Sequence, residues 1–246
     1  MLIDSRAWID PEAASLTQLE VEMKRAGVQR AVLTSDSRQY LLESAQSSDF
    51  LAAVLPFDPL NVSELHVLQH LSAEGKLSGI RPHPAAPHRW INAREADPFW
   101  DAAAQLNLPV DLLFRSDEYN QLSDVVTGFP RARLVIDHLG RGPETDGAQF
   151  LPILLEYARY PQVHVRISGL FRISELSFPY SDLWPVIRKI YRRFGAHRLT
   201  WGSDYPEVMS HGGYSAAARL IDSLPFLSSK DKEWINSTTA LKLWFS

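Results

Sequence analysis

Short apolar runs alternate with amphipathic segments along the chain. Eight such runs occur, at residues 1–4, 30–35, 50–56, 77–84, 108–114, 132–139, 163–170 and 198–206. Several are almost entirely apolar, as at residues 51–55 and 134–136. Their starts lie 20 to 35 residues apart, which leaves room for a helix after each run. Continuous apolar runs with this spacing are typical of parallel strands covered on both faces.

The segments between the runs carry helix signals. One predicted helix spans residues 10–26, because an Asp-Pro pair suits its first turn and Gly27 suits its end. Another is predicted to begin at residues 97–98, also an Asp-Pro pair. A third is predicted to begin at Ser228, which forms a capping-box pattern with Asp231.

Eight alternating strand and helix units predict a single α/β domain over residues 1–246, folded as a (β/α)8 TIM barrel. An open doubly wound sheet also alternates strands with helices. However, no Gly-rich phosphate-binding fingerprint follows any of the apolar runs. Closure into a barrel is therefore the favoured prediction.

Composition and charge argue against a nucleic-acid-binding protein and against a membrane-spanning one. The net charge of -4 offers no basic surface for nucleic acid, and no run of about 18 apolar residues is present for a membrane span. A cytoplasmic location is the resulting expectation. The chain has no cysteine, so a metal site would need His and carboxylate ligands.

Ionisable side chains follow two of the most apolar runs. Asp204 stands after residues 198–201, and His138 stands beside Asp137 after residues 134–136. Because active sites of barrels lie at the carboxyl ends of the strands, Asp204 and His138 are predicted to be catalytic. His138 would serve as general acid, oxyanion donor or metal ligand. The alternatives are an Asp that caps the next turn and a structural His.

Basic side chains also gather at these strand ends. Arg81 and His83 are two residues apart and share one face of a strand, although the adjacent prolines equally suit a rigid turn. Arg166 lies inside an apolar strand, where it must either clamp an anionic substrate or pair with an Asp of a neighbouring strand. The candidate substrate-binding residues are Arg6, Arg81, His83, Arg115, Arg166 and Tyr205.

Sequence blocks spread over nearly the whole chain resemble one family. They are Gly-Ile-Arg-Pro-His-Pro at 79–84, Leu-Pro-Val-Asp-Leu-Leu at 108–113, Phe-Pro at 129–130, Leu-Val-Ile-Asp-His-Leu-Gly at 134–140, Ile-Ser-Gly-Leu at 167–170, Phe-Gly at 194–195, Arg-Leu-Thr-Trp-Gly-Ser-Asp-Tyr-Pro at 198–206 and Thr-Ala at 239–240. In this order they resemble the amidohydrolase superfamily, in its amidohydrolase-2 group, and the branch similar to 2-pyrone-4,6-dicarboxylate and sugar-acid lactonases. The resemblance implies a distorted (β/α)8 barrel in which Asp204 activates water.

The first strand departs from the family pattern. The family carries His-x-His there, whereas this chain has Arg6 and Trp8, and its first histidine is His66. His138 and Asp204 alone make a poor ligand set, so no metal and no other cofactor is expected. A guanidinium cannot act as a Lewis acid on water, but it can supply a positive charge to a substrate carboxylate or carbonyl oxygen.

Together these features predict a metal-independent hydrolase, a lactonase for a small carboxylated or sugar-derived lactone. Asp204 would be the general base and His138 would polarise the carbonyl. Arg81, Arg115 and Arg166 would hold the oxygens of a small anionic substrate.

Two alternatives remain open on sequence grounds. One is a decarboxylase or isomerase of the same superfamily, and the other is a non-catalytic barrel that binds a ligand or a partner. A tight bidentate pair between Arg6 and Asp204 would favour the non-catalytic barrel, whereas an open pocket between them would favour catalysis.

Overall fold

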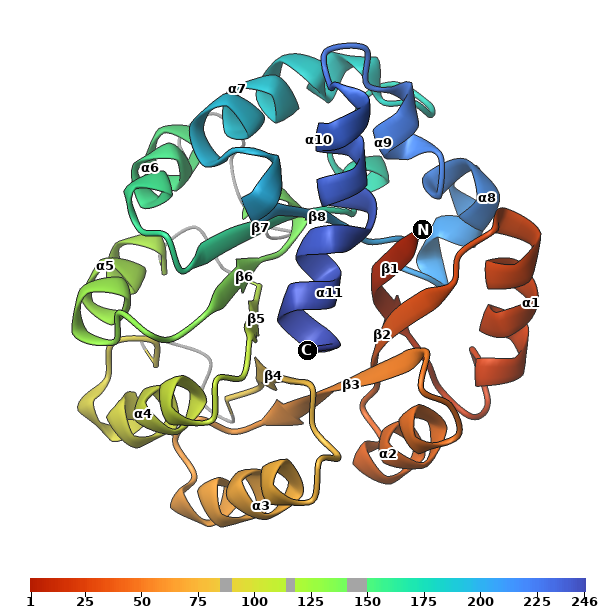
Figure 1. Cartoon of the computed structure of the whole chain (residues 1–246). Coiled ribbons are helices and arrows are strands. Elements are labelled where there is room, and N and C mark those ends of the chain that lie inside the picture. The colour runs from red at the N-terminus through yellow and green to blue at the C-terminus, as the bar shows by residue number, and fades with distance from the viewer. Residues whose placement is uncertain (85–89, 114–117, 141–149) are drawn as a thin grey trace.

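The computed structural model describes residues 1–84, 90–113, 118–140 and 150–246. Each predicted apolar run overlaps one strand of a single parallel sheet, and the strands pair in chain order. Figure 1 shows them arranged around a common centre. The strands are β1 (Ile3–Trp8), β2 (Arg30–Thr34), β3 (Leu51–Phe57), β4 (Gly79–Pro82), β5 (Val110–Leu112), β6 (Leu134–Ile136), β7 (Val163–Ile167) and β8 (Leu199–Trp201).

The sheet closes where β1 meets the chain that follows β8. The backbone N–H of Trp8 donates to the carbonyl of Tyr205 (2.8 Å), and that of Asp204 donates to the carbonyl of Arg6 (3.1 Å). The register of β1 shifts before Ala7, so the barrel is irregular at this seam. The predicted (β/α)8 barrel and its distortion are therefore confirmed.

Helices form the outer ring of the barrel (Figure 1). None in the described ranges is long and apolar enough to cross a membrane. Two short 3-10 helices border the site, η4 (Leu170–Arg172) after β7 and η7 (Glu207–Ser210) after β8. The α-helices are α1 (Leu16–Ala26), α2 (Arg38–Gln46), α3 (Val62–Ala73), α4 (Asp97–Gln105), α5 (Tyr119–Gly128), α6 (Phe150–Glu156), α7 (Trp184–Phe194), α8 (Tyr214–Ala217), α9 (Leu220–Ser223), α10 (Ser229–Glu233) and α11 (Thr239–Trp244).

The predicted start of the first helix is wrong. Helix α1 begins after Ser15, whose side chain and that of Gln18 form a reciprocal capping box. Asp10 instead accepts hydrogen bonds from the backbone of residues 12 and 13 and closes a local turn. The predicted end at Gly27 is confirmed, because Gly27 adopts φ 72° as the left-handed cap. The helix starts predicted at residues 97 and 228 also agree with α4 and α10.

The C-terminal helix fills one end of the barrel. Figure 1 shows α11 crossing the centre of the ring of strands. Its residues Leu243 and Trp244 pack against Ile3, Val32 and Val54 from the first three strands. This apolar plug occupies the amino-terminal end of the barrel. The opposite end, where the polar side chains of the strand termini meet, is left for a functional site.

Candidate active site

A buried carboxylate on β1 fixes the loop that carries Asp204. Asp4 accepts hydrogen bonds from the backbone N–H (2.8 Å) and Oγ (2.6 Å) of Ser203 and from the hydroxyl of Tyr214 (2.9 Å). It also accepts from the backbone N–H of Arg6 (3.0 Å). One carboxylate thus ties Arg6 and the Asp204 loop together. Burial raises the pKa of Asp4 to about 6, although these hydrogen bonds act in the opposite direction.

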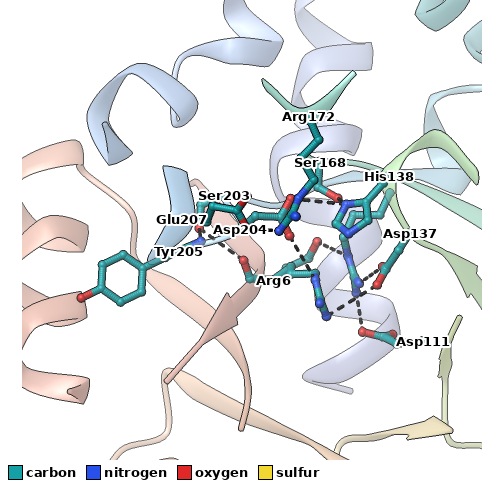
Figure 2. Close-up of polar contacts among 12 residues, drawn as sticks. Arg6, Asp111, Asp137, His138, Ser168, Arg172, Ser203, Asp204, Tyr205 and Glu207 are labelled. Carbon is teal, nitrogen blue, oxygen red and sulfur yellow. Dashed lines mark hydrogen bonds and ion pairs between the residues drawn. The ribbon is translucent and has the colours of Figure 1, made fainter. Parts of the chain in front are cut away.

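The guanidinium of Arg6 lies between two carboxylates (Figure 2). Its Nε donates to Asp204 Oδ1 at 3.1 Å, and its Nη1 lies 3.5 Å from Asp137 Oδ2. The contact with Asp204 is therefore made through one nitrogen and is not bidentate. Arg6, Trp8 and Asp204 line a cavity of about 340 Å³. The arrangement matches neither alternative set out from the sequence, because the two side chains touch but through a single nitrogen, and both still line the cavity.

His138 faces the other oxygen of Asp204. Its Nδ1 lies 2.9 Å from Ser168 Oγ and 3.3 Å from Asp204 Oδ2. Gly169 adopts φ 60°, and a Cβ there would lie 2.6 Å from His138 Nδ1. Only glycine leaves room for the imidazole at this turn. Asp204 and His138 therefore meet as predicted, although they come from β8 and β6.

Arg166 lies beneath this pair and is fully buried. Its Nη2 donates to Asp111 Oδ2 at 2.8 Å, its Nη1 donates to Asp137, and its Nε donates to Ser5 Oγ at 3.0 Å. The ring of Trp244 lies 5.0 Å away on the barrel floor. With no exposed surface and two carboxylate partners, Arg166 fits the ion-pair alternative and not the predicted substrate clamp.

The charges around the site keep its two central carboxyls ionised. Burial alone would raise the pKa of Asp204, but His138 and Arg6 outweigh burial and lower it below its usual value. Burial would likewise raise the pKa of Asp137, but Arg166, Arg6 and Arg81 together hold it well below its usual range. Asp204 therefore carries a full negative charge at neutral pH, as a general base requires.

The structure describes three of the four other predicted site residues. Arg81 joins the network through Asp137 Oδ2 at 2.9 Å and keeps 17% of its side chain exposed. His83 is exposed beyond β4, where its backbone N–H donates to Phe57. Arg115 lies outside the described residues. The ring of Tyr205 points away from Asp204 in Figure 2 and packs edge-on against Tyr214, yet Tyr205 is among the residues that line the cavity, so its contact with substrate stays a prediction.

Four residues of the site were not predicted. Asp4 and Asp111 are acidic residues in predicted strands, and a charged residue in a buried strand is as unusual there as Arg166 is in β7. Arg172 and Glu207 form an ion pair across the mouth and line the cavity with Asp204 (Figure 2). They lie in two short 3-10 helices at the surface, η4 and η7, where the sequence gives no burial signal.

The donor set does not fit a divalent metal ion. Within the described residues, no group of three or more His, Cys, Asp and Glu side chains is arranged to hold one. Arg6 instead places a permanent positive charge 3.1 Å from Asp204, and that charge opposes a metal cation at the same carboxylate. The chemistry available here is that of Asp204, His138 and Arg6.

Comparison with known proteins places this barrel in a family. The Amidohydro_2 model, described as amidohydrolase, matches residues 5–245. L-fucono-1,5-lactonase of Burkholderia ambifaria is 33% identical over 201 residues, which cover 76% of this chain and 68% of that protein. The 4-sulfomuconolactone hydrolase of Rhizobium radiobacter is 26% identical over 209 residues, which cover 81% and 67%.

A solved structure shares the fold. An amidohydrolase from Burkholderia multivorans with bound zinc superposes with a TM-score of 0.81 at 21% identity, covering 99% of this chain and 98% of that one. The resemblance seen in the sequence blocks is confirmed by these matches. With the family model spanning nearly its whole length and an Asp–His pair at its barrel mouth, this chain belongs to the amidohydrolase family.

Proposed function

We propose that this protein hydrolyses a small lactone at the mouth of the barrel without a metal ion. The observation that carries the proposal is that Arg6 and Asp204, paired through a single nitrogen at 3.1 Å, both line a cavity of about 340 Å³. Support also comes from the two relatives, each named for action on a lactone. A cavity of this size suits one substituted five- or six-membered ring.

Asp204 is the general base of the proposed reaction. Its Oδ1 is engaged by Arg6, and its buried Oδ2 faces His138 Nδ1 at 3.3 Å. A water that reaches this carboxylate from the cavity would lose its proton to it as it attacks the lactone carbonyl. The lowered pKa keeps the carboxylate ready to accept that proton at neutral pH.

Arg6 and His138 stabilise the oxyanion that forms. Nε of Arg6 donates to Asp204, and Nη1 lies near Asp137. Neither of these contacts with the described residues uses Nη2, which can therefore donate to the carbonyl oxygen. His138, 3.3 Å from Asp204, lies on the opposite side of the same carboxylate and polarises the carbonyl. When the ring C–O bond breaks, the proton on Asp204 passes to the leaving oxygen and yields a hydroxy acid.

The charge balance bears on the class of lactone. The charged residues of the described cavity lining are Arg6, Arg172, Asp204 and Glu207, and their formal charges cancel. A carboxylated lactone, the anionic substrate expected from the sequence, would add a negative charge with no free cation of this lining to balance it. A neutral, sugar-derived lactone therefore fits this cavity better.

A lactone panel tests the proposal. Sugar-derived lactones, including L-fucono-1,5-lactone and D-glucono-1,5-lactone, and carboxylated lactones would be followed with a pH indicator in weak buffer, with and without chelator. Hydrolysis above the spontaneous rate that persists in chelator and disappears in Asp204→Asn is the expected result. If no lactone is opened faster than in buffer, lactone hydrolysis is not the activity.

A further inference from the structure

A second cavity lies beside the catalytic one. It has a volume of about 470 Å³, larger than that of the catalytic cavity. The same two short helices border both: Phe171 of η4 and Ser210 of η7 line the outer cavity, while Arg172 and Glu207 of these helices line the catalytic one. The two linings also touch, because the guanidinium of Arg172 lies over the ring of Phe171, 5.5 Å from its centroid.

On the side of the catalytic cavity, Arg172 forms an ion pair with Glu207. Both side chains are well exposed, at 44% and 41%. Ion pairs with this much exposure contribute little to stability because water competes for both charges. A ligand that spans the two cavities can therefore separate Arg172 from Glu207 at small cost.

The outer cavity has aromatic walls. The rings of Phe171 and His211 stack with their centroids 4.5 Å apart and their planes 9° from parallel, and Phe178 meets Tyr180 edge-on at 6.0 Å. The hydroxyl of Tyr180 donates to the carbonyl of His211 at 3.1 Å, which joins the two loops that form the walls. These contacts hold the walls in place before any ligand arrives.

Polar groups interrupt the aromatic walls. Glu175 and Ser177 line the same cavity, and the backbone of Glu175 is fixed by a 3.0 Å hydrogen bond from its N–H to Asp182. The negative charge of Glu175 disfavours an anionic group. The ring of Phe171 stacks on His211 and carries the Arg172 guanidinium 5.5 Å from its centroid, so a ligand gains a face of this ring only where Arg172 moves aside. Aromatic walls combined with acceptors for hydroxyl groups suit a neutral polyhydroxylated ring.

We propose that the outer cavity binds a second, neutral sugar ring attached to the lactone, so that the substrate is a glycosylated aldonolactone. The inference rests on the proposed lactone hydrolysis and names its substrate class. One ring occupies each cavity, and the linkage between them passes where Arg172 and Glu207 now meet.

Matched substrates test this subsite. D-glucono-1,5-lactone and maltobiono-1,5-lactone share the reacting ring, but only the second carries an additional glucose. The expected result is a higher kcat/KM for maltobionolactone, with the preference reduced about tenfold in Phe171→Ala because a packed aromatic face is lost. Glu175→Gln, an exposed change without risk to folding, should lower the same preference.

Phe226→Ala is the matched control, because Phe226 is also half-buried and lines a surface cavity beside α7. It should leave the ratio of the two kcat/KM values unchanged. No preference for maltobionolactone in the parent, or an equal loss for both lactones in Phe171→Ala with the preference intact in Glu175→Gln, overturns the subsite.

Binding of neutral, unreactive analogues separates the subsite from the reaction. Calorimetry with maltitol and sorbitol, which carry no carboxylate, needs no turnover. If neither lactone is hydrolysed but maltitol binds more tightly and Phe171→Ala removes the difference, lactone hydrolysis is wrong and the subsite stands. If the lactones are hydrolysed while the two alditols bind equally, the hydrolase stands and the subsite is wrong.

Discussion

Arg6 is the residue that most distinguishes this site from the family pattern. It stands on the first strand, at the position where the family resemblance implies a histidine, and it contacts Asp204 through a single nitrogen. A guanidinium keeps its charge at every pH at which the protein is folded. The ionisation of Asp204 is therefore tied to a neighbouring residue that cannot titrate.

Asp204→Asn should lower kcat by about 100- to 10,000-fold, because the amide keeps the shape of the carboxylate and loses the base. The fold should stay intact, although the melting temperature should fall because Arg6 loses a carboxylate partner. Asp101→Asn, at an exposed position of α4, is the control and should behave like the parent. Turnover within a few-fold of the parent in Asp204→Asn would place the base elsewhere.

Arg6→Met should move the acid limb of the pH profile. The pKa of Asp204 is lowered in the folded protein in part by Arg6, so activity is present above that pKa and is lost as the pH falls through it. Without Arg6 that pKa rises, and the acid limb of kcat/KM should shift to higher pH. Arg6→Lys should shift it less. If the acid limb of kcat/KM does not move in Arg6→Met, Arg6 does not lower the pKa of Asp204.

Among the elements, β1 organises the loops that carry the catalytic groups. Asp4 binds both its own strand at Arg6 and the loop at Ser203, while the turn after β7 leaves room for His138 only because residue 169 is glycine. The pair of Asp204 and His138 is thus positioned from three strands. Changes in these supports should alter catalysis without touching a substrate.

Gly169→Ala should reduce kcat by at least about tenfold and the free energy of unfolding by about 1–3 kcal/mol, because the new Cβ meets the imidazole of His138 and the backbone has a left-handed φ. Gly128→Ala is the control, since a Cβ there has no atom within 4 Å. Kinetics and thermal melts would be measured on both. Full activity in Gly169→Ala would show that His138 can move without consequence.

Asp4→Asn should change how stability depends on pH. The pKa of Asp4 is raised to about 6 in the folded protein, so its contribution to stability is fully present below pH of about 4 and is lost as the pH rises through 6. That loss amounts to about 3 kcal/mol. The melting temperature of Asp4→Asn relative to the parent should therefore increase from pH 4 to pH 7. A constant difference would show that Asp4 does not titrate in this range.

At the scale of the whole molecule, the barrel interior holds a neutral ionic network. Its members are three arginines and three aspartates, Arg6, Arg81, Arg166, Asp111, Asp137 and Asp204. Removing one partner of a buried pair commonly costs about 3–5 kcal/mol because the other charge is left uncompensated. Below the network, Trp244 of α11 closes the barrel and lies against Arg166. The floor of the barrel thus supports the site at its mouth.

The same network predicts how the whole protein responds to metal removal. Because Arg6 holds Asp204 and the donor set does not fit a divalent ion, dialysis against chelator should leave both activity and melting temperature unchanged. Elemental analysis should find far less than one zinc or manganese per chain. One equivalent of metal together with loss of activity in chelator would contradict the assignment of Arg6.

Features that depend on residues close together in the sequence were predictable from it. Apolar runs gave the strand positions, and the Asp-Pro and Ser-x-x-Asp patterns gave the starts of α4 and α10. Asp204 and His138 were identified because each follows an apolar strand, and parallel strands of a barrel end at one mouth. The start of α1 was missed because two capping residues, Asp10 and Ser15, lie close together and both suit the role.

Tertiary structure decided how the charges pair. Arg166 meets Asp111 and Asp137, which lie 55 and 29 residues away along the chain, so no local pattern distinguishes this ion pair from a substrate clamp. The same holds for Asp4, whose partner Ser203 is 199 residues distant. Hydrophobic periodicity is a local property and fixes where strands and helices form. The burial and pairing of a charge depend on side chains brought together only when the barrel closes.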